Sequence, residues 1–253
     1  MEKKYIVDKS NRRSFYLFDL LKKEGHTVYD YDENAVFNDP CTFIFTPSKV
    51  LTKKTLDKIP ADSTVFYFKK DCDKLYPSVR FVNLSTNDAF RRINSRLSAE
   101  GALALCISNT DCALLNSSLL VLGYGKLGSA VASVFAPLSA KVSVAAFTLQ
   151  EANDAGRKYP TFYKREFCST LSSFDVIINT VPANVMTAED VASIKEGALY
   201  LELASPPYGI DPSMGKTLKA KYILGNALPD KYCPKSAGEA LLSVIDKTYK
   251  EVD

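Results

Sequence analysis

The feature that most constrains the fold of this chain is a glycine-rich turn between an apolar segment and an amphipathic one. Residues 119–122 form a continuous apolar run, which is typical of a strand buried on both faces. The hexapeptide Gly123-Tyr124-Gly125-Lys126-Leu127-Gly128 follows at once, and apolar residues then recur at helical spacing up to Phe135. A G-x-G-x-x-G turn between a strand and a helix, with a second strand about twenty residues further on, predicts a dinucleotide-binding unit.

Each glycine of this turn has a physical role in such a unit. Gly123 permits the tight turn out of the strand, Gly125 leaves room for a pyrophosphate against the backbone, and Gly128 lets the helix lie close to the strand. The start of the helix offers free N–H groups and partial positive charge to the phosphates. The alternative interpretation is a glycine turn that serves packing alone.

The residues after the second strand bear on the choice of nucleotide. Sites for NAD usually end this strand with Asp or Glu, which binds the ribose 2′-hydroxyl. Here the stretch ends with Phe147 and Thr148, and no acid occurs before Glu151. No Arg is present there to bind a 2′-phosphate, although Thr148 has a hydroxyl and Lys126 lies within the loop. We expect NADP, with NAD as the alternative.

Further strands are expected at residues 141–145, 175–179, 198–203 and 221–224. The carboxyl ends of strands border the ligand crevice in a doubly wound sheet. Two short loops follow such ends, and their members are candidates for contact with a flat ligand: Asn179, Thr180, Val181 and Pro182 in one loop, and Ala204 and Ser205 in the other. In a third loop, Lys231 and Lys235 either hold a carboxylate or are solvated surface lysines.

The N-terminal part alternates between strands and helices. Strands are expected at residues 4–7, 27–31, 42–46 and 64–68, and a helix around residues 15–21 ends near Gly25. This alternation indicates a parallel α/β sheet. A helical stretch at residues 88–108 would connect the two parts. We therefore expect two α/β domains of unequal size, at residues 1–96 and 97–253.

Composition excludes several classes of protein. The chain has 253 residues, of which 46% are hydrophobic, and a formal net charge of +3. These values argue against disorder and against a protein that coats nucleic acid. No apolar run is long enough to cross a bilayer, and the first eight residues do not form a signal peptide, so a cytoplasmic protein is expected.

The cysteine and histidine residues limit the metal sites and catalytic mechanisms that are possible for this chain. The six cysteines are scattered without C-x-x-C spacing, which favours reduced thiols and argues against a zinc site: Cys41, Cys72, Cys106, Cys112, Cys168 and Cys233. The single histidine, His26, falls between an expected helix and an expected strand, where a structural or solvent-exposed role is favoured. A mechanism that depends on a histidine acid or base therefore has almost no candidate in this chain.

The order of motifs resembles that of the A subunits of dipicolinate synthases. The segments that carry the resemblance are 97–102, the glycine turn 123–128, 179–182, 203–206, 228–229 and 234–238, with a weaker similarity around residues 11–14. The resemblance covers nearly the whole chain and is strongest at residues 97–245. Several motifs in one order are more specific than a glycine turn alone.

The resemblance implies an N-terminal flavodoxin-like domain and a C-terminal NAD(P)-binding Rossmann domain. It also implies oxidation of a dihydrodipicolinate-type ring to pyridine-2,6-dicarboxylate, a product of bacterial spores, with hydride transfer to NADP. The partner that it implies is a flavoprotein-like B subunit. Arg13, Lys231 and Lys235 are the cations in matching segments that would hold the small dicarboxylate substrate. A homodimer is compatible with this interpretation, since Rossmann enzymes often pair.

The chain also departs from the family pattern. Ala145-Ala146-Phe147 replaces the usual Gly-Ala-Arg at the end of the second Rossmann strand, and Pro206-Pro207-Tyr208 and Asp230 replace other family residues. Two alternatives therefore remain open. One is a non-catalytic nucleotide-binding regulatory paralogue, and the other is an oxidoreductase that acts on another small carboxylic acid.

Overall fold

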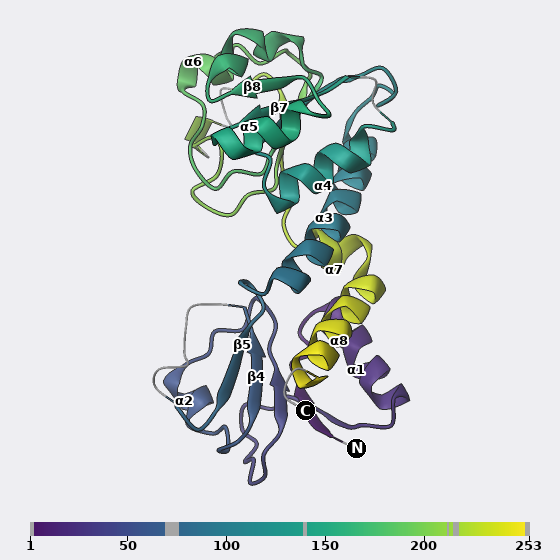
Figure 1. The fold of residues 1–253 in the computed structure, drawn as a ribbon, viewed down its shortest axis with the longest axis vertical. Coiled ribbons are helices and arrows are strands. Elements are labelled where there is room, and N and C mark those ends of the chain that lie inside the picture. Colours follow the sequence, from purple (N-terminus) through teal and green to yellow (C-terminus); the bar gives the residue numbers. More distant parts are fainter. Residues whose placement is uncertain (1–2, 69–75, 139–140, 212, 215–217, 251–253) are drawn as a thin grey trace. The chain divides into compact units, whose positions relative to one another are not determined.

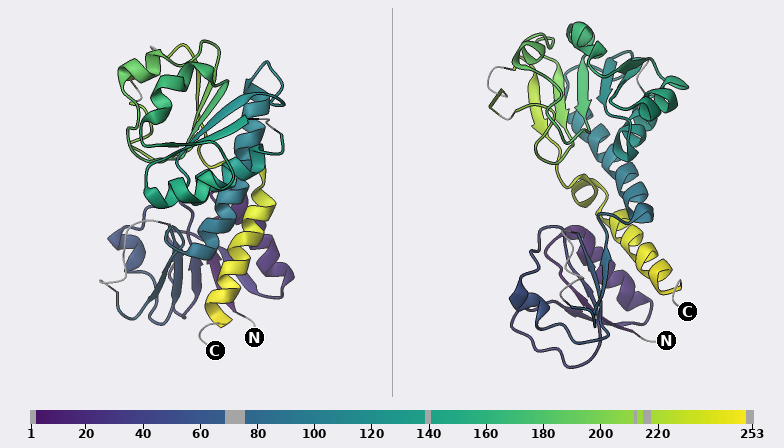
Figure 2. Two further views of the ribbon diagram at one scale, coloured as in Figure 1. Left: turned by 45° about the horizontal axis from the view of Figure 1, so that its top comes forward. Right: turned by 60° about the vertical axis from the view of Figure 1, so that its left-hand side comes forward.

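The computed structural model describes residues 3–68, 76–138, 141–211, 213–214 and 218–250 (Figures 1 and 2). The chain divides into two compact units. Unit 1 combines Met1–Asn94 with Pro229–Asp253, and unit 2 is Ser95–Leu228. Cys72 lies outside the described residues.

Unit 2 contains a six-stranded parallel sheet. Its strands are β6 (Ser118–Leu122), β7 (Lys141–Ala146), β8 (Thr161–Tyr163), β9 (Val176–Asn179), β10 (Leu199–Glu202) and β11 (Lys221–Leu224). They lie in the order β11-β10-β9-β6-β7-β8. The chain winds outwards from β6 to β8 and then returns to β9 on the other side, which is the doubly wound arrangement of a Rossmann domain. The expected fold class is confirmed.

Both faces of this sheet are buried. Leu119 and Val121 of β6 point into one core, which they share with residues of α4 (Lys126–Phe135) and α5 (Leu149–Gly156). Leu120 and Leu122 point into a second core, which is covered by η2 (Glu166–Ser173) and α6 (Ala188–Ala192). A strand with both faces buried has no solvent-facing positions, which explains its unbroken apolar sequence.

Unit 1 contains a five-stranded parallel sheet. Its strands are β1 (Lys4–Val7), β2 (Thr27–Asp30), β3 (Thr42–Ile44), β4 (Thr64–Tyr67) and β5 (Arg80–Asn83). The order β2-β1-β3-β4-β5 is that of flavodoxin-like sheets. Helix α1 (Arg12–Lys23) covers one face, and a short helix, α2 (Lys53–Leu56), follows β3. The sequence had no clear signal for β5 or α2, which are only four residues long.

A long helix, α3 (Asp88–Asn109), joins the two units along the chain. It continues through Gly101 without interruption, because one glycine costs a long helix only about 1 kcal/mol. No helix in the described ranges is long and apolar enough to span a bilayer.

The C-terminal segment differs from expectation. Helices α7 (Leu228–Tyr232) and α8 (Pro234–Lys250) follow the last strand of unit 2, yet residues from Pro229 onward belong to unit 1. The second domain therefore does not extend from residue 97 to 253 as one unit. Figure 1 shows α8 beside α1, and apolar side chains of both helices share a core. Burial of this apolar face determines which unit α8 joins.

Candidate functional site

In unit 2 the chain forms strands on one side of β6 and then returns to form the others on the opposite side, so the strand order reverses between the neighbouring parallel strands β6 and β9. The loops after these two strands therefore border the expected ligand crevice. The loop after β6 is the glycine loop, residues 123–128. The loop after β9 begins with Thr180, whose hydroxyl donates to the Leu122 carbonyl oxygen at 2.7 Å. The Thr180 amide donates to the same oxygen at 3.0 Å. The two loops are thus fixed to each other at the reversal point.

The glycine loop is tight at two of its glycines and open at the third. Gly123 has a φ of +89°, and a Cβ there would stand 2.7 Å from Val181 and 2.8 Å from Thr180. A Cβ on Gly128 would stand 2.1 Å from the Gly123 carbonyl oxygen. Gly125, the N-cap of α4, is exposed, and a Cβ there would have one described neighbour within 4 Å. Among the three described glycines of the loop, Gly125 is therefore the one that leaves space for a phosphate.

A buried carboxylate organises the neighbouring loops. Glu202, the last residue of β10, has no exposed surface. Its Oε1 accepts from the Asn179 amide at 2.7 Å and from the Ala204 N–H at 2.9 Å, and its Oε2 accepts from the Gly209 N–H at 2.9 Å. Burial raises the pKa of Glu202, and the three N–H donors oppose that rise. Glu202 positions both loops that contain the candidate residues.

Sequence reasoning did not assign a role to Glu202. The sequence feature that could have indicated a role for Glu202 is that it is a single acid inside the otherwise apolar run 198–203. Asn179, which was a candidate for contact with the cofactor, is fully buried and uses its side chain to hold the loop. Its Oδ1 accepts from the Val181 N–H at 3.1 Å, and its amide also donates to the Val181 carbonyl oxygen at 3.0 Å. Asn179 is thus a loop-positioning residue in this structure.

The turn after β7 carries an acid that reaches back towards the strand. Thr148 caps α5 and accepts from the Glu151 N–H at 3.2 Å. The Glu151 Oε2 accepts from the Phe147 N–H at 3.1 Å. The Glu151 Oε1 is the atom that lies 3.8 Å from a Cβ built on Gly125. An acid therefore stands at the end of the second strand and beside the glycine loop.

In unit 1, Arg13 is a buried cation at the carboxyl end of the sheet. It lies in the first turn of α1, directly after β1, and is 6% exposed. Its guanidinium lies 5.1 Å from the ring centre of Phe68, and Nη1 donates to Asn94 Oδ1 at 3.4 Å. Nε is buried with no hydrogen-bond partner among the described residues. Burial lowers the pKa of Arg13, and the charge of Asp230 opposes that effect.

Asp230 is already engaged by the backbone. Its Oδ1 accepts from the Arg13 main-chain N–H at 2.7 Å. No ion pair of the Arg13 guanidinium with a carboxylate is found within the described ranges. A buried cation with an unused N–H donor can bind an anionic ligand tightly, because the ligand supplies both the missing hydrogen bond and the opposite charge. The sequence indicated Arg13 as a candidate but gave no sign of its burial, which depends on Asn94 and Phe68, far away along the chain.

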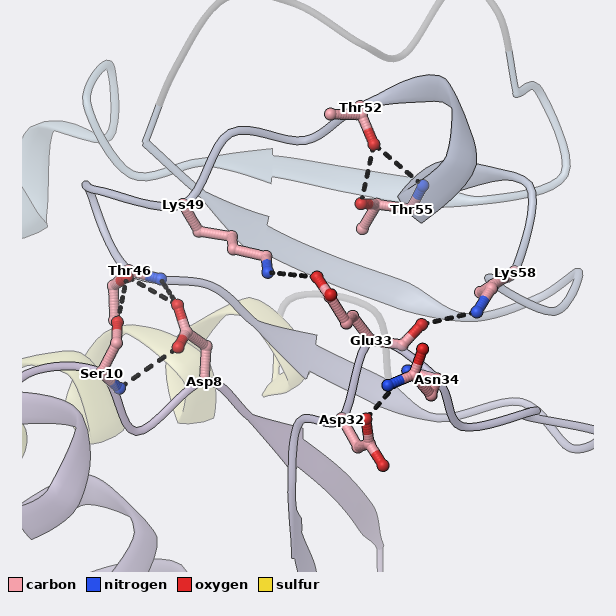
Figure 3. A network of polar contacts seen from close by, with 10 residues as sticks. All are labelled: Asp8, Ser10, Asp32, Glu33, Asn34, Thr46, Lys49, Thr52, Thr55 and Lys58. Atoms are coloured by element: carbon pink, nitrogen blue, oxygen red, sulfur yellow. Dashed lines mark hydrogen bonds and ion pairs between the residues drawn. The ribbon is translucent and has the colours of Figure 1, made fainter.

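Figure 3 shows a second polar cluster of unit 1, at the reversal point between β1 and β3. Asp8 accepts from the Ser10 N–H at 3.2 Å and from the Thr46 hydroxyl at 2.6 Å. The Ser10 and Thr46 hydroxyls lie 2.9 Å apart. Because both carboxylate oxygens accept hydrogen bonds from within the cluster, Asp8 ties the two loops together.

The remaining candidates lie on the surface. Ser205 is exposed in the loop after β10, and its carbonyl oxygen accepts from Tyr208. Lys231 has an exposed side chain, and its carbonyl oxygen accepts from Arg12 at 2.9 Å. Lys235 pairs with Glu239 at 3.9 Å, and its side chain is 70% exposed. All three side chains are therefore open to solvent.

His26 directly precedes β2 and therefore lies at the amino end of the sheet of unit 1. Its ring packs against Tyr5 with 5.2 Å between the ring centres. The ligand-facing edge of a parallel sheet is the opposite one. No cluster of metal-ligating side chains is found in the part of the chain that the structure describes.

No family model matches this chain. It is 29% identical over 219 residues to the A subunit of dipicolinate synthase from Bacillus subtilis (strain 168), covering 83% of this chain and 72% of that protein.

Two solved structures share the fold. The dipicolinate synthase A chain from Bacillus subtilis superposes with a TM-score of 0.87 at 22% identity, covering 100% of this chain and 97% of that one. The corresponding dipicolinate synthase chain from Bacillus halodurans gives a TM-score of 0.84 at 24% identity, with 97% of each chain covered. In sequence and in fold, this chain is similar to the A subunit of dipicolinate synthase, which confirms the resemblance indicated by its motifs.

Proposed function

We propose that this chain is an oxidoreductase that binds a nicotinamide dinucleotide on the glycine loop of unit 2 and oxidises a small cyclic dicarboxylate. The name of the Bacillus subtilis relative supports a dihydrodipicolinate-type ring as substrate and dipicolinate as product. Because that relative is named as one subunit of its enzyme, a second subunit is a natural partner, for which we propose a flavoprotein-like B subunit.

The observation that carries the proposal is the open position at Gly125, between two closed glycines and at the reversal point of the sheet. Main-chain N–H groups at the start of α4 would hold the pyrophosphate there. Thr180, Val181 and Pro182 follow β9 at the same edge and would border the nicotinamide half. The open space at Gly125 and the start of α4 directly after it fit the pyrophosphate of such a cofactor.

Arg13 would bind a carboxylate of the substrate. A guanidinium forms two parallel hydrogen bonds with a carboxylate, and its Nε is one of the donors suited to that geometry. The unused Nε of Arg13 supports this role. Lys231 and Lys235 are exposed, so we assign them no more than a supporting electrostatic role.

The chemistry requires little from an acid or base. A dihydropyridine ring loses one hydride and one proton when it becomes aromatic. The dinucleotide, when bound, supplies the hydride acceptor. The proton passes to solvent, and aromatisation favours the reaction, which is compatible with the position of the lone His26 at the other edge of its sheet.

The test is a titration of the full chain with NADH and NADPH by calorimetry. Gly125→Asp should abolish binding of both, because the new carboxylate would collide with and repel the pyrophosphate. Gly156→Asp is the matched control, since Gly156 lies in open space at the end of α5 and gains the same charge. Absence of binding by the unaltered chain, or equal binding by Gly125→Asp, would refute the proposal.

A nucleotide-binding regulatory protein is the second candidate. The observation that favours it is the departure from the family pattern at Ala145-Ala146-Phe147 and at Pro206-Pro207-Tyr208. Dinucleotide binding without turnover of any dihydropyridine dicarboxylate, with or without a B subunit, would identify this function instead.

A further inference from the structure

We propose that Glu151 makes the dinucleotide site select NAD(H) over NADP(H). This inference rests on the proposed function, because it concerns the same glycine loop. It reverses the preference that the sequence suggested, which relied on the absence of an acid between Ala145 and Thr148.

Glu151 is held through both its main chain and its side chain. Its main-chain N–H donates to the Thr148 hydroxyl at 3.2 Å, and its Oε2 accepts from the Phe147 N–H at 3.1 Å. A Glu at the third position of a capped helix commonly turns back towards the residues before the helix. Here this turn directs the carboxylate to the carboxyl end of β7.

The other carboxylate oxygen faces the glycine loop. Oε1 stands 3.8 Å from the Cβ position of Gly125 and is the one described atom within 4 Å of it outside the adjacent chain. The hydrogen bond from the Phe147 N–H engages Oε2 and leaves Oε1 directed at this position. Glu151 thus adjoins the two features between which such sites hold the adenosine ribose, namely the end of the second strand and the glycine loop.

The charge of the Glu151 carboxylate affects NAD(H) and NADP(H) differently. A carboxylate oxygen accepts hydrogen bonds from ribose hydroxyls, which NAD(H) retains. NADP(H) replaces the 2′-hydroxyl with a phosphate of about two negative charges, which a fixed carboxylate repels. A pocket that accommodates NADP(H) normally provides a cation at this place.

The turn after β7 provides no cation that could bind a 2′-phosphate. Residues 147–156 contain neither Lys nor Arg. At the end of the neighbouring β8, Lys164 places its ammonium group 5.0 Å from the centre of the Tyr163 ring. Within residues 147–156, Glu151 is the acid whose carboxylate lies beside Gly125.

The experiment measures dissociation constants of NADH and NADPH for the full chain and for Glu151→Gln. The glutamine keeps the size of the side chain and a carbonyl acceptor for the Phe147 N–H, and it removes the negative charge. Glu166→Gln is the matched control. Glu166 also accepts a main-chain N–H at the end of a strand, that of Tyr163 at 2.7 Å, but it is not among the atoms near Gly125.

We expect the unaltered chain to bind NADH at least about tenfold more tightly than NADPH, as a close pair of like charges implies. Glu151→Gln should reduce that ratio by about tenfold, mainly through tighter binding of NADPH. Glu166→Gln should leave the ratio unchanged.

Two results would overturn the inference alone: NADPH binding at least as tightly as NADH to the unaltered chain, or an unchanged ratio in Glu151→Gln. The first comparison needs no variant and stands even if the substitution impairs folding. Failure of both nucleotides to bind would overturn the proposed function and this inference together.

Discussion

Arg13 combines burial with an incomplete set of hydrogen bonds. The side chains around its guanidinium provide aromatic rings and an amide, and its Nε has no described partner. Removal of a charge from water has a cost that a carboxylate partner normally offsets. At Arg13 the cost of removing the charge from water is only partly offset. We therefore expect this residue to contribute more to ligand binding than to the stability of the fold.

The expected effect can be measured with pyridine-2,6-dicarboxylate as the ligand. Arg13→Lys keeps the charge but loses the paired donors, and affinity should fall by about 10- to 100-fold, as for loss of charge-assisted hydrogen bonds. Arg13→Met should abolish binding and change the free energy of unfolding by less than about 1 kcal/mol. Calorimetry and urea unfolding give the two values.

Arg12→Lys is the control for that series. Arg12 precedes Arg13, is exposed, and donates to the Lys231 carbonyl oxygen, so its replacement should leave ligand affinity unchanged. Equal affinities of the unaltered chain and Arg13→Lys would contradict the assigned role. A large loss of stability in Arg13→Met would indicate a structural role.

At the scale of elements, the approach of α8 to α1 depends on Gly238. A Cβ on Gly238 would lie 3.0 Å from the Arg13 carbonyl oxygen and 3.1 Å from the Leu17 nitrogen. Both are main-chain atoms, which cannot rotate away as a side-chain end could. Close helix packing at this point also fixes the turn of α1 that carries Arg13.

Gly238→Val should therefore destabilise the protein by about 2–3 kcal/mol, since the added methyl groups overpack a backbone contact. Gly156→Val, at a helix end with open space, should change stability by less than about 1 kcal/mol. Chemical unfolding of both variants measures the difference. A similar effect of the two substitutions would show that the contact between α1 and α8 has little energetic importance.

At the scale of the whole molecule, the chain starts and ends in the same unit. Unit 1 needs residues from Pro229 onward to cover Leu17 and Leu21, whereas all six strands of the other sheet lie within Ser95–Leu228. Each unit has its own core, so the two respond differently to loss of the C-terminus.

A chain that ends at Leu228 tests this division. Limited proteolysis should cut it within residues 3–94, where an apolar face has lost its cover, and should spare unit 2. Dinucleotide affinity should change by less than about threefold, which is under 1 kcal/mol. Loss of dinucleotide binding, or proteolysis of unit 2 at the same rate, would contradict the independence of the two cores.

Much of the fold follows from local sequence patterns. The strand before Gly123, the helix after it and the parallel character of both sheets were predictable, because periodicity and glycine positions act over a few residues. The short strands β5 and β8 lack such a pattern, since their neighbours in the sheet supply most of their stabilisation.

The sequence by itself determined the glycine loop, the two α/β sheets and the resemblance to dipicolinate synthases. Tertiary structure decided the burial of Arg13, the three contacts of Glu202, the direction of the Glu151 carboxylate and the unit that α8 joins. These features depend on burial and on contacts made once the chain has folded. Loss of water around a polar group is a property of its surroundings, and local sequence does not encode it.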